Sequence, residues 1–198
     1  VIRYGMTREW VLGLKVVTGA GDILEFNHGL IKNNTGYDFR HLFIGSEGTL
    51  GIICEATIQL TKPPEESVVL MLGVDNFQAI LNVLKMFNSQ INLMAFEFFS
   101  QFALDKVVEH QGHSAPFDTR TPFYALIEFE TKSGQILDTA MELFEYCIEQ
   151  GWVIEGIASQ SESQAKKLWE LREDISETLW HYQPYKNDIS VRVSRMPD

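Results

Sequence analysis

Two stretches of this chain combine residue types and spacings that could bind an anionic ligand. The first, residues 42–60, reads LFIGSEGTLGIICEATIQL and places glycines at three-residue intervals. A residue without Cβ lets the backbone take positive φ and lets another molecule approach closely. Such a turn directs several N–H groups into one concavity, which suits an anionic or carbonyl-rich ligand. A plain glycine-rich turn before a buried strand is the alternative, and chemistry alone favours it because no nucleotide-binding spacing is present.

The second stretch is a predicted helix over residues 161–181, which begins at a capping box completed by Gln164. Arg172 lies about 40° from Leu168, at the edge of the apolar stripe, with Ser176 one turn further on. A guanidinium beside a buried face needs an anionic partner and can hold a carboxylate through two parallel hydrogen bonds. From spacing alone, an intramolecular salt bridge or a snorkelling side chain explains Arg172 better than a ligand does. The predicted stripe comprises Leu168, Leu171, Ile175 and Leu179.

The histidines and cysteines do not form a convincing catalytic or metal-binding set. His110 and His113 have metal-ligand spacing, but they flank Gly112, where a helix should end, so we expect two surface histidines. Cys54 and Cys147 both lie in apolar patterns and are predicted to be buried thiols rather than a disulfide or metal framework. The isolated histidines are His28, His41 and His181.

Composition describes a globular, acidic chain. The 198 residues are 45% hydrophobic and 12% aromatic, which supports a genuine core. The net charge of −11 argues against nucleic acid or an anionic membrane surface as a partner. No stretch is long enough for a membrane span and no signal peptide is recognisable, so a cytoplasmic or mitochondrial-matrix setting is expected. The absence of an initial Met suggests a fragment of a longer protein.

Charge and proline positions predict two parts. Residues 1–60 carry five basic and six acidic residues, whereas the remainder carries eleven and twenty-one. The boundary is expected at residues 62–66, KPPEE, where two prolines interrupt regular structure. The first part should be β-rich with little helix. Its predicted elements are strand 10–18, turn 19–22, strand 23–26, one or two helical turns within 37–44 and a long strand over 50–60.

The second part alternates strand and helix. Asp75 is the predicted cap of a helix with a stripe of Phe77, Ile80, Leu81, Leu84 and Phe87, and a helix over 101–111 should end at Gly112. The order strand–helix–strand, repeated, predicts a ferredoxin-like split βαβ arrangement, with an antiparallel sheet and helices on one face. The fold class is therefore α+β. The remaining predicted elements are strands 67–73, 93–99, 123–130 and 152–158, loop 112–121 and helix 136–150.

Several ordered motifs resemble one family of flavoenzymes. GSEGTLGII, preceded by NNTGYDFRHLF and RYGMTREWVLGLKVVTGAGDIL, resembles the second half of the FAD-binding domain of the vanillyl-alcohol-oxidase, or PCMH, type. The resemblance covers almost the whole chain and is closest to the branch of D-2-hydroxyglutarate dehydrogenases, D-lactate dehydrogenases and glycolate oxidases. It implies that residues 1–62 are the C-terminal part of a PCMH-type FAD-binding domain. Residues 66–198 would then be the N-terminal part of the substrate, or cap, domain of an FAD-linked oxidase.

The resemblance also implies roles for single residues. LWELREDISETL is similar to a family segment in which the arginine and a hydroxyl bind substrate, here Arg172 and Ser176. PYKNDISV resembles a segment whose lysine contacts the substrate carboxylate, here Lys186 at the start of a predicted strand, although Asn187 departs from the family pattern. The implied cofactor-binding residues are Arg3, Gly5, Asn34, Thr35, Ser46, Glu47, Gly48, Gly51 and Ile53.

The activity implied is FAD-dependent oxidation of a D-2-hydroxy acid to the 2-oxo acid, with hydride transfer to the flavin. Two cationic groups suit a dicarboxylate, so D-2-hydroxyglutarate is preferred over D-lactate or glycolate. No catalytic residue or metal ligand is expected in this chain; a base and a divalent metal such as zinc would come from an absent C-terminal part. The electron acceptor (quinone, flavoprotein, cytochrome or, in an oxidase, oxygen) and a homodimer stay open. A non-catalytic ferredoxin-like binding module is the alternative from another class.

Overall fold

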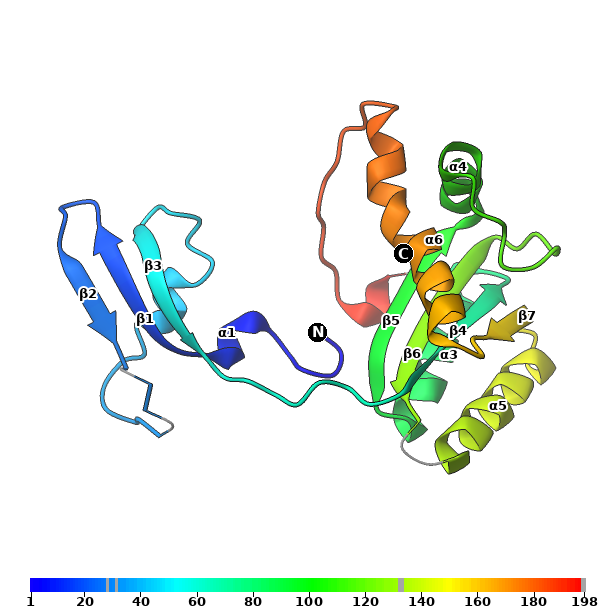
Figure 1. The fold of residues 1–198 in the computed structure, drawn as a ribbon, viewed down its shortest axis with the longest axis horizontal. Coiled ribbons are helices and arrows are strands. Elements are labelled where there is room, and N and C mark those ends of the chain that lie inside the picture. Colours follow the sequence, from blue (N-terminus) through cyan, green and yellow to red (C-terminus); the bar gives the residue numbers. More distant parts are fainter. Residues whose placement is uncertain (28, 31, 132–133, 197–198) are drawn as a thin grey trace. The chain divides into compact units, whose positions relative to one another are not determined.

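The computed structural model describes residues 1–27, 29–30, 32–131 and 134–196, so His28 lies outside the described residues. The chain divides into two compact units, Arg3–Pro63 and Pro64–Asp198, and each is described by itself. Figure 1 labels most of their helices and strands. In the part of the chain that the structure describes, no helix combines the length and the apolar character needed to cross a membrane.

The first unit is a three-stranded antiparallel sheet in the order β2-β1-β3, accompanied by two helices of one turn. This arrangement confirms the prediction of a β-rich part with little helix, although the first short helix was not predicted. The elements are α1 (Thr7–Trp10), β1 (Val11–Thr18), β2 (Ile23–Phe26), α2 (Arg40–Phe43) and β3 (Gly51–Ile58).

The first unit has a small core on one face of its sheet. Leu14 and Val16 alternate along β1 and pack with Phe43 of α2. Strand β3 differs from the expectation of a buried strand, because the side chains from Ile52 to Ile58 are exposed within the described residues. Ile52, for example, is 64% exposed.

Cys54 is exposed, so the prediction of a buried thiol is wrong for this residue. The pairing of β1 with β3 shifts register between Lys15 and Val16, which oppose Glu55 and Ile53 respectively. Cys54 is therefore the extra residue of a β-bulge, and its Sγ lies 3.3 Å from the carbonyl oxygen of Lys15. The exposure of Cys54 is shared by the whole of β3 from Ile52 onward, so an apolar sequence pattern does not correspond to burial in this strand.

The second unit has a four-stranded antiparallel sheet in the order β5-β6-β4-β7. Numbered along the chain, the four strands therefore lie in the sheet in the order second, third, first and fourth. Helix α3 connects the first strand to the second and α5 connects the third to the fourth, so the predicted split βαβ arrangement is confirmed. The elements are β4 (Ser67–Val74), α3 (Phe77–Gln90), β5 (Leu93–Ser100), α4 (Gln101–Gln111), β6 (Phe123–Glu130), α5 (Gly134–Glu149), β7 (Val153–Ala158), α6 (Glu162–Trp180) and the 3₁₀ turn η1 (Val193–Arg195).

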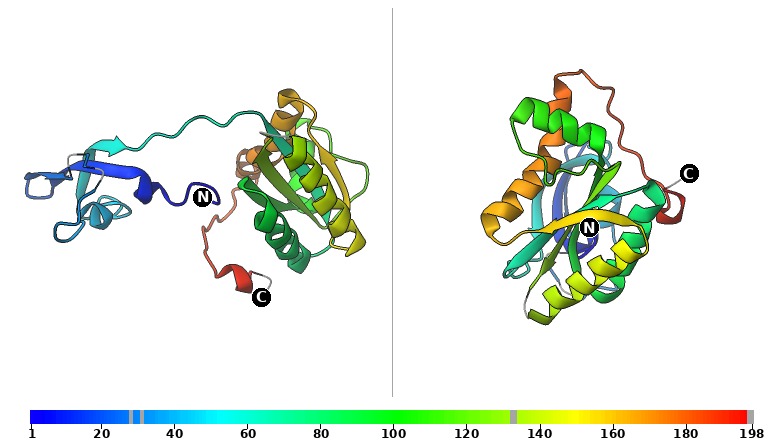
Figure 2. Two further views of the ribbon diagram at one scale, coloured as in Figure 1. Left: turned by 90° about the horizontal axis from the view of Figure 1, so that it is seen from below. Right: turned by 90° about the vertical axis from the view of Figure 1, so that its right-hand side faces the viewer.

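Helices cover both faces of this sheet, which corrects the expectation of helices on one face. Leu70, Leu72 and Val74 of β4 pack with α3 and α5. Val69 and Met71, which alternate with them, pack with α4 and α6. The right-hand view of Figure 2 shows the two pairs of helices on opposite sides of the strands. A strand that is buried on both faces needs consecutive apolar residues, and SVVLMLGV has that pattern.

Local capping explains where the helices begin and end. The cap of α3 is Asn76, whose side chain accepts a hydrogen bond from the N–H of Ala79 at 2.9 Å, so the prediction of Asp75 is wrong by one residue. Asp75 instead accepts a hydrogen bond from the Asn76 amide. Helix α4 ends at Gly112, as predicted, because this glycine takes the left-handed conformation at φ 72°.

We expect Ile127→Ala to lower the free energy of unfolding by about 2 to 5 kcal/mol, because the change leaves a cavity in the core. Ile127 of β6 is fully buried between neighbouring strands and a helical layer. Ile154→Ala on β7 is the matched control, because Ile154 is 43% exposed, and it should cost less than about 1 kcal/mol. Urea unfolding monitored by circular dichroism measures both; equal losses would contradict the burial described here.

The two thiols should differ in reactivity. Burial raises the pKa of Cys147 to about 11, whereas Cys54 is exposed. Because the thiolate is the reactive form, a disulfide reagent at mildly alkaline pH should modify Cys54 in the native chain and Cys147 only after unfolding. Mass spectrometry of labelled peptides measures this order, and Cys54→Ser is the control that should abolish native labelling. Labelling of Cys147 at the rate of Cys54 would show that the core around α5 is open.

Candidate functional sites

The glycine turn before β3 has the backbone geometry that its sequence predicts. Gly45 and Gly48 take φ of 86° and 78°, and Glu47 between them takes 52°. The turn is closed by hydrogen bonds from the Ser46 N–H to the Phe43 carbonyl and from the Thr49 N–H to the Ser46 carbonyl. Within the described residues, no backbone carbonyl accepts a hydrogen bond from the N–H of Glu47 or Gly48. Those two donors remain available to a ligand.

Glycine is needed at positions 48 and 51 of this turn for different structural reasons. A Cβ on Gly51 would lie 2.7 Å from the Val17 carbonyl oxygen and 2.8 Å from Val16 Cγ1, so Gly51 is needed for strand pairing whether or not a ligand binds. A Cβ on Gly48 would have only Ile52 Cδ1, at 3.9 Å, near it. Gly48 is therefore required for its positive φ, and the space above it is open.

The other residues predicted to bind a cofactor lie in separate local structures. Gly5, at φ 70°, precedes α1, and the Glu9 carboxylate caps that helix through the Met6 N–H at 3.0 Å. Arg3 stacks on the Tyr4 ring at 5.1 Å. The Thr35 N–H donates to the Asn33 side chain at 3.1 Å. No hydrogen bond among the described residues joins Thr35 or the adjoining Asn34 to the glycine turn. Ile53 lies on β3 and is 42% exposed.

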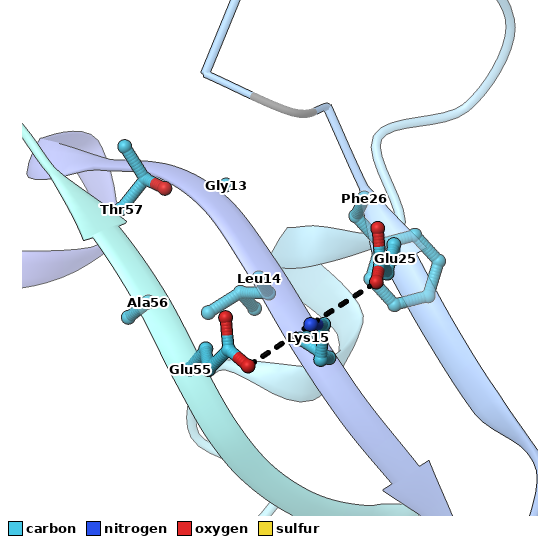
Figure 3. Close-up of a pocket in the computed structure, with 8 residues that line it drawn as sticks. All are labelled: Gly13, Leu14, Lys15, Glu25, Phe26, Glu55, Ala56 and Thr57. Carbon is cyan, nitrogen blue, oxygen red and sulfur yellow. Dashed lines mark hydrogen bonds and ion pairs between the residues drawn. The ribbon is translucent and has the colours of Figure 1, made fainter.

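Sequence reasoning did not single out the hollow over β1. Its volume is about 160 Å³ and Lys15 lies at its centre. Figure 3 shows the Lys15 ammonium between two carboxylates, Glu55 at 2.9 Å and Glu25 at 3.2 Å. Hydrogen bonds to Glu55 and Glu25 raise the pKa of Lys15. The cation is already matched by two anions, so this hollow does not suit an acidic ligand.

In the second unit, α6 carries the cationic candidate. Ser161 caps the helix by accepting a hydrogen bond from the Gln164 N–H, while the Gln164 side chain accepts from the N–H of Gln160 rather than of Ser161. Arg172 reaches across to β5, where Glu97 Oε2 lies 3.1 Å from Nε and 2.9 Å from Nη2. The two side chains are 34% and 39% exposed, so the pair lies at the rim of the core. An intramolecular salt bridge, the alternative that spacing favoured, is therefore present in this chain.

The rest of the α6 stripe is nearly as predicted. Leu168 and Leu171 are buried against α4 and the sheet. At the end of the helix the buried residue is Thr178, which accepts a hydrogen bond from Gln111 at 3.4 Å, and the predicted Leu179 is only half-buried. Ser176 is exposed one turn beyond Arg172, so both side chains are accessible on the same side of the helix.

Lys186 lies in an exposed segment that is neither helix nor strand, so the predicted strand around it is wrong. The chain leaves α6 through Gln183, which takes a positive φ of 48°. The hydroxyl of Tyr182 lies 2.7 Å from His110 Nε2 of α4, which anchors the beginning of the segment. Lys106, which is also on α4, places its Nζ over the Tyr182 ring, 5.2 Å from the ring centroid.

The histidines of the second unit are engaged with neighbours rather than isolated. His110 stacks on His181 at 5.0 Å, which corrects the view of His181 as isolated. His113 is partly buried and lies 2.6 Å from Asp174 of α6, so it is not a plain surface histidine. No group of three or more potential metal ligands occurs among the described residues.

A wider hollow of about 990 Å³ lies in the second unit between the start of α6, α5 and the start of β4. Its charged lining is mainly acidic, with Glu65, Glu66, Glu128 and Glu162 against a single lysine, Lys166. Such a lining disfavours a dicarboxylate, so this hollow is a poorer candidate for an acid substrate than the rim that holds Arg172.

Comparison with known proteins identifies the family. Residues 63–198 match the family described as FAD linked oxidases, C-terminal domain. Because that match covers most of the chain, the chain belongs to the FAD linked oxidases, and the predicted family is confirmed. It is 56% identical over 197 residues to the D-2-hydroxyglutarate dehydrogenase of Stutzerimonas stutzeri, covering 100% of this chain and 42% of that protein. It is 37% identical to the mitochondrial D-2-hydroxyglutarate dehydrogenase of Bos taurus, covering 100% of this chain and 37% of that protein.

Solved structures support the fold. The 4-ethylphenol oxidase of Gulosibacter chungangensis matches with a TM-score of 0.61 at 14% identity, covering 92% of this chain and 42% of that one. An alkyldihydroxyacetonephosphate synthase matches with a TM-score of 0.55 at 21% identity, covering 87% and 34%. The predicted α+β fold class is confirmed. The chain spans about two fifths of the length of the curated relatives named above.

Proposed function

We propose that the full-length protein oxidises a D-2-hydroxy acid to the 2-oxo acid with FAD as cofactor, and that D-2-hydroxyglutarate is the substrate. The observation that carries this proposal is the partly exposed guanidinium of Arg172 at the rim of the second unit. It is supported by identity over the whole chain with proteins named D-2-hydroxyglutarate dehydrogenase.

Three residues of this chain would hold the substrate. Arg172 can grip a carboxylate in the plane of its guanidinium, and Ser176 can add a hydrogen bond from its hydroxyl. Lys186 would supply the second positive charge from the segment after α6. Two cations match the two carboxylates of D-2-hydroxyglutarate, whereas a monocarboxylate would leave one cation without a partner. Lys186 lies in an exposed segment with no helix or strand around it, so its side chain is accessible to a ligand.

The first unit would supply part of the FAD cradle. The available N–H groups of Glu47 and Gly48 and the open space above Gly48 fit a ligand rich in oxygen atoms. Bound FAD supplies the redox chemistry by accepting a hydride from C2 of the substrate. The other residues proposed to face the cofactor are Arg3, Gly5, Asn34, Thr35, Ser46, Gly51 and Ile53. In this assignment residues 1–62 complete an FAD-binding domain and residues 66–198 begin the cap domain.

Several finer points belong to the same proposal. The base and a divalent metal such as zinc would come from parts of the protein outside this chain. The electron acceptor would be a quinone, a flavoprotein or a cytochrome, and the protein would work as a homodimer in the cytoplasm or the mitochondrial matrix. D-lactate is the second candidate substrate, because a relative from Schizosaccharomyces pombe that is 33% identical over 203 residues is named a putative D-lactate dehydrogenase.

We expect Arg172→Ala to raise KM for D-2-hydroxyglutarate by about tenfold to a hundredfold in the full-length flavoprotein, because a charge-assisted contact is lost. Steady-state kinetics with an artificial dye acceptor measure this change, with D-lactate and glycolate as comparison substrates. Lys166→Ala is the matched control, since Lys166 lies on the same helix and is 79% exposed. Unchanged kinetics for Arg172→Ala would defeat the substrate assignment.

We expect Gly48→Ala to weaken FAD binding roughly tenfold, because a methyl group would intrude on the space that the cofactor fills. The flavin absorbance of purified full-length protein, titrated with FAD, reports occupancy. Gly112→Ala is the control, because Gly112 has a similar φ of 72° and no atom near its Cβ position. Equal flavin occupancy in both variants would place the cofactor away from this turn. A colourless wild-type protein that FAD does not restore would favour the non-catalytic module.

A further inference from the structure

We propose that Glu97 is a positioning residue that orients Arg172 for the substrate carboxylate; this inference rests on the function proposed above. Glu97 Oε2 lies 3.1 Å from Nε and 2.9 Å from Nη2 of Arg172, so one oxygen lies against one side edge of the guanidinium. Nη1 has no partner among the described residues. An arginine has five donors in a rigid plane, and the edge that includes Nη1 is left for a second carboxylate.

The sheet holds Glu97 rigidly. Glu97 lies on β5 opposite Leu126 of β6, and Leu126 is fully buried in the core beneath α4 and α6. Leu168 and Leu171 of α6 pack into the same core, which keeps the helix at a constant distance from the strand. Because both ends of the ion pair are fixed by packed elements, the guanidinium plane is held before any ligand arrives. Pre-organisation of this kind lowers the cost of ordering on binding.

Charge is consistent with a positioning role rather than with permanent neutralisation. Each side chain is more than a third exposed, at 34% for Arg172 and 39% for Glu97, so water screens their attraction. Because the screened attraction is weak, the orientation of the guanidinium rests on the contact of Oε2 with two nitrogen atoms and on the packed elements that carry both residues. A ligand that binds the guanidinium edge that includes Nη1 would not need to displace Glu97. Glu97 and the substrate therefore do not compete for the same donors.

The test compares Glu97→Ala and Glu97→Gln in the full-length flavoprotein. Glu97→Ala should raise KM for D-2-hydroxyglutarate about tenfold and change kcat by less than about threefold, because a misoriented arginine weakens binding before the chemical step. Glu97→Gln keeps an oxygen that accepts from Nε and should restore KM to within about threefold of wild type. Glu173→Ala, an exposed carboxylate next to Arg172 in sequence, is the control for lost negative charge and should leave KM unchanged.

An unchanged or lower KM in Glu97→Ala would overturn the inference, and a lower KM would indicate a competitor that the substrate displaces. Equal losses in the alanine and glutamine variants would overturn it as well, because a merely structural role would not distinguish them. In the double variant with Arg172→Ala, the effect of Glu97→Ala should disappear; additive effects would again contradict positioning. A strong Arg172→Ala effect with a neutral Glu97→Ala removes only this inference, whereas a neutral Arg172→Ala removes the proposed substrate role.

Discussion

Burial of β4 and β6 on both faces is the constraint on which the second unit depends. Each strand is hydrogen-bonded on both sides and covered above and below by helices, so each needs a run of consecutive apolar side chains, residues 68–72 in β4 and 123–127 in β6. The layer of α4 and α6 is fixed by this requirement, because Leu168 and Leu171 have to reach the sheet. The position of Arg172 at the rim follows from that packing, since it adjoins Leu171 in the helix.

Because Arg172 lies at the rim of the core, it can form an intramolecular salt bridge and still have donors accessible to a ligand. A guanidinium deep in the core would need all its donors satisfied by the protein. At the edge strand β5, one carboxylate oxygen engages two nitrogen atoms and leaves the remaining donors accessible. The salt bridge and the proposed ligand contact therefore use different edges of the same plane. The geometry of this side chain therefore allows the observed salt bridge and the proposed ligand contact at the same time.

The glycine turn combines roles in a similar way. Gly51 permits β1 and β3 to approach, which is a structural need, while Gly45 and Gly48 supply left-handed backbone around exposed N–H groups. On the sheet of the first unit, Glu25 and Glu55 balance the charge of Lys15 in the hollow over β1. The turn offers two backbone donors, the N–H groups of Glu47 and Gly48, that no backbone carbonyl of the described residues engages.

The sequence by itself determined the two parts, most strands and helices, the family and the residues that form the turn and the α6 stripe. The family was identified from the resemblance of ordered motifs, whereas the strands, the helices, the turn and the stripe depend on local periodicity, caps and glycine positions, which are determined by residues close together in the sequence. Only the tertiary structure decided that helices cover both sheet faces, that Cys54 lies in a bulge and that Lys186 has no strand around it. It also decided the partner of Arg172, because Glu97 is 75 residues away along the chain. Strand register and helix packing bring such residues together, and neither can be read from spacing within one element.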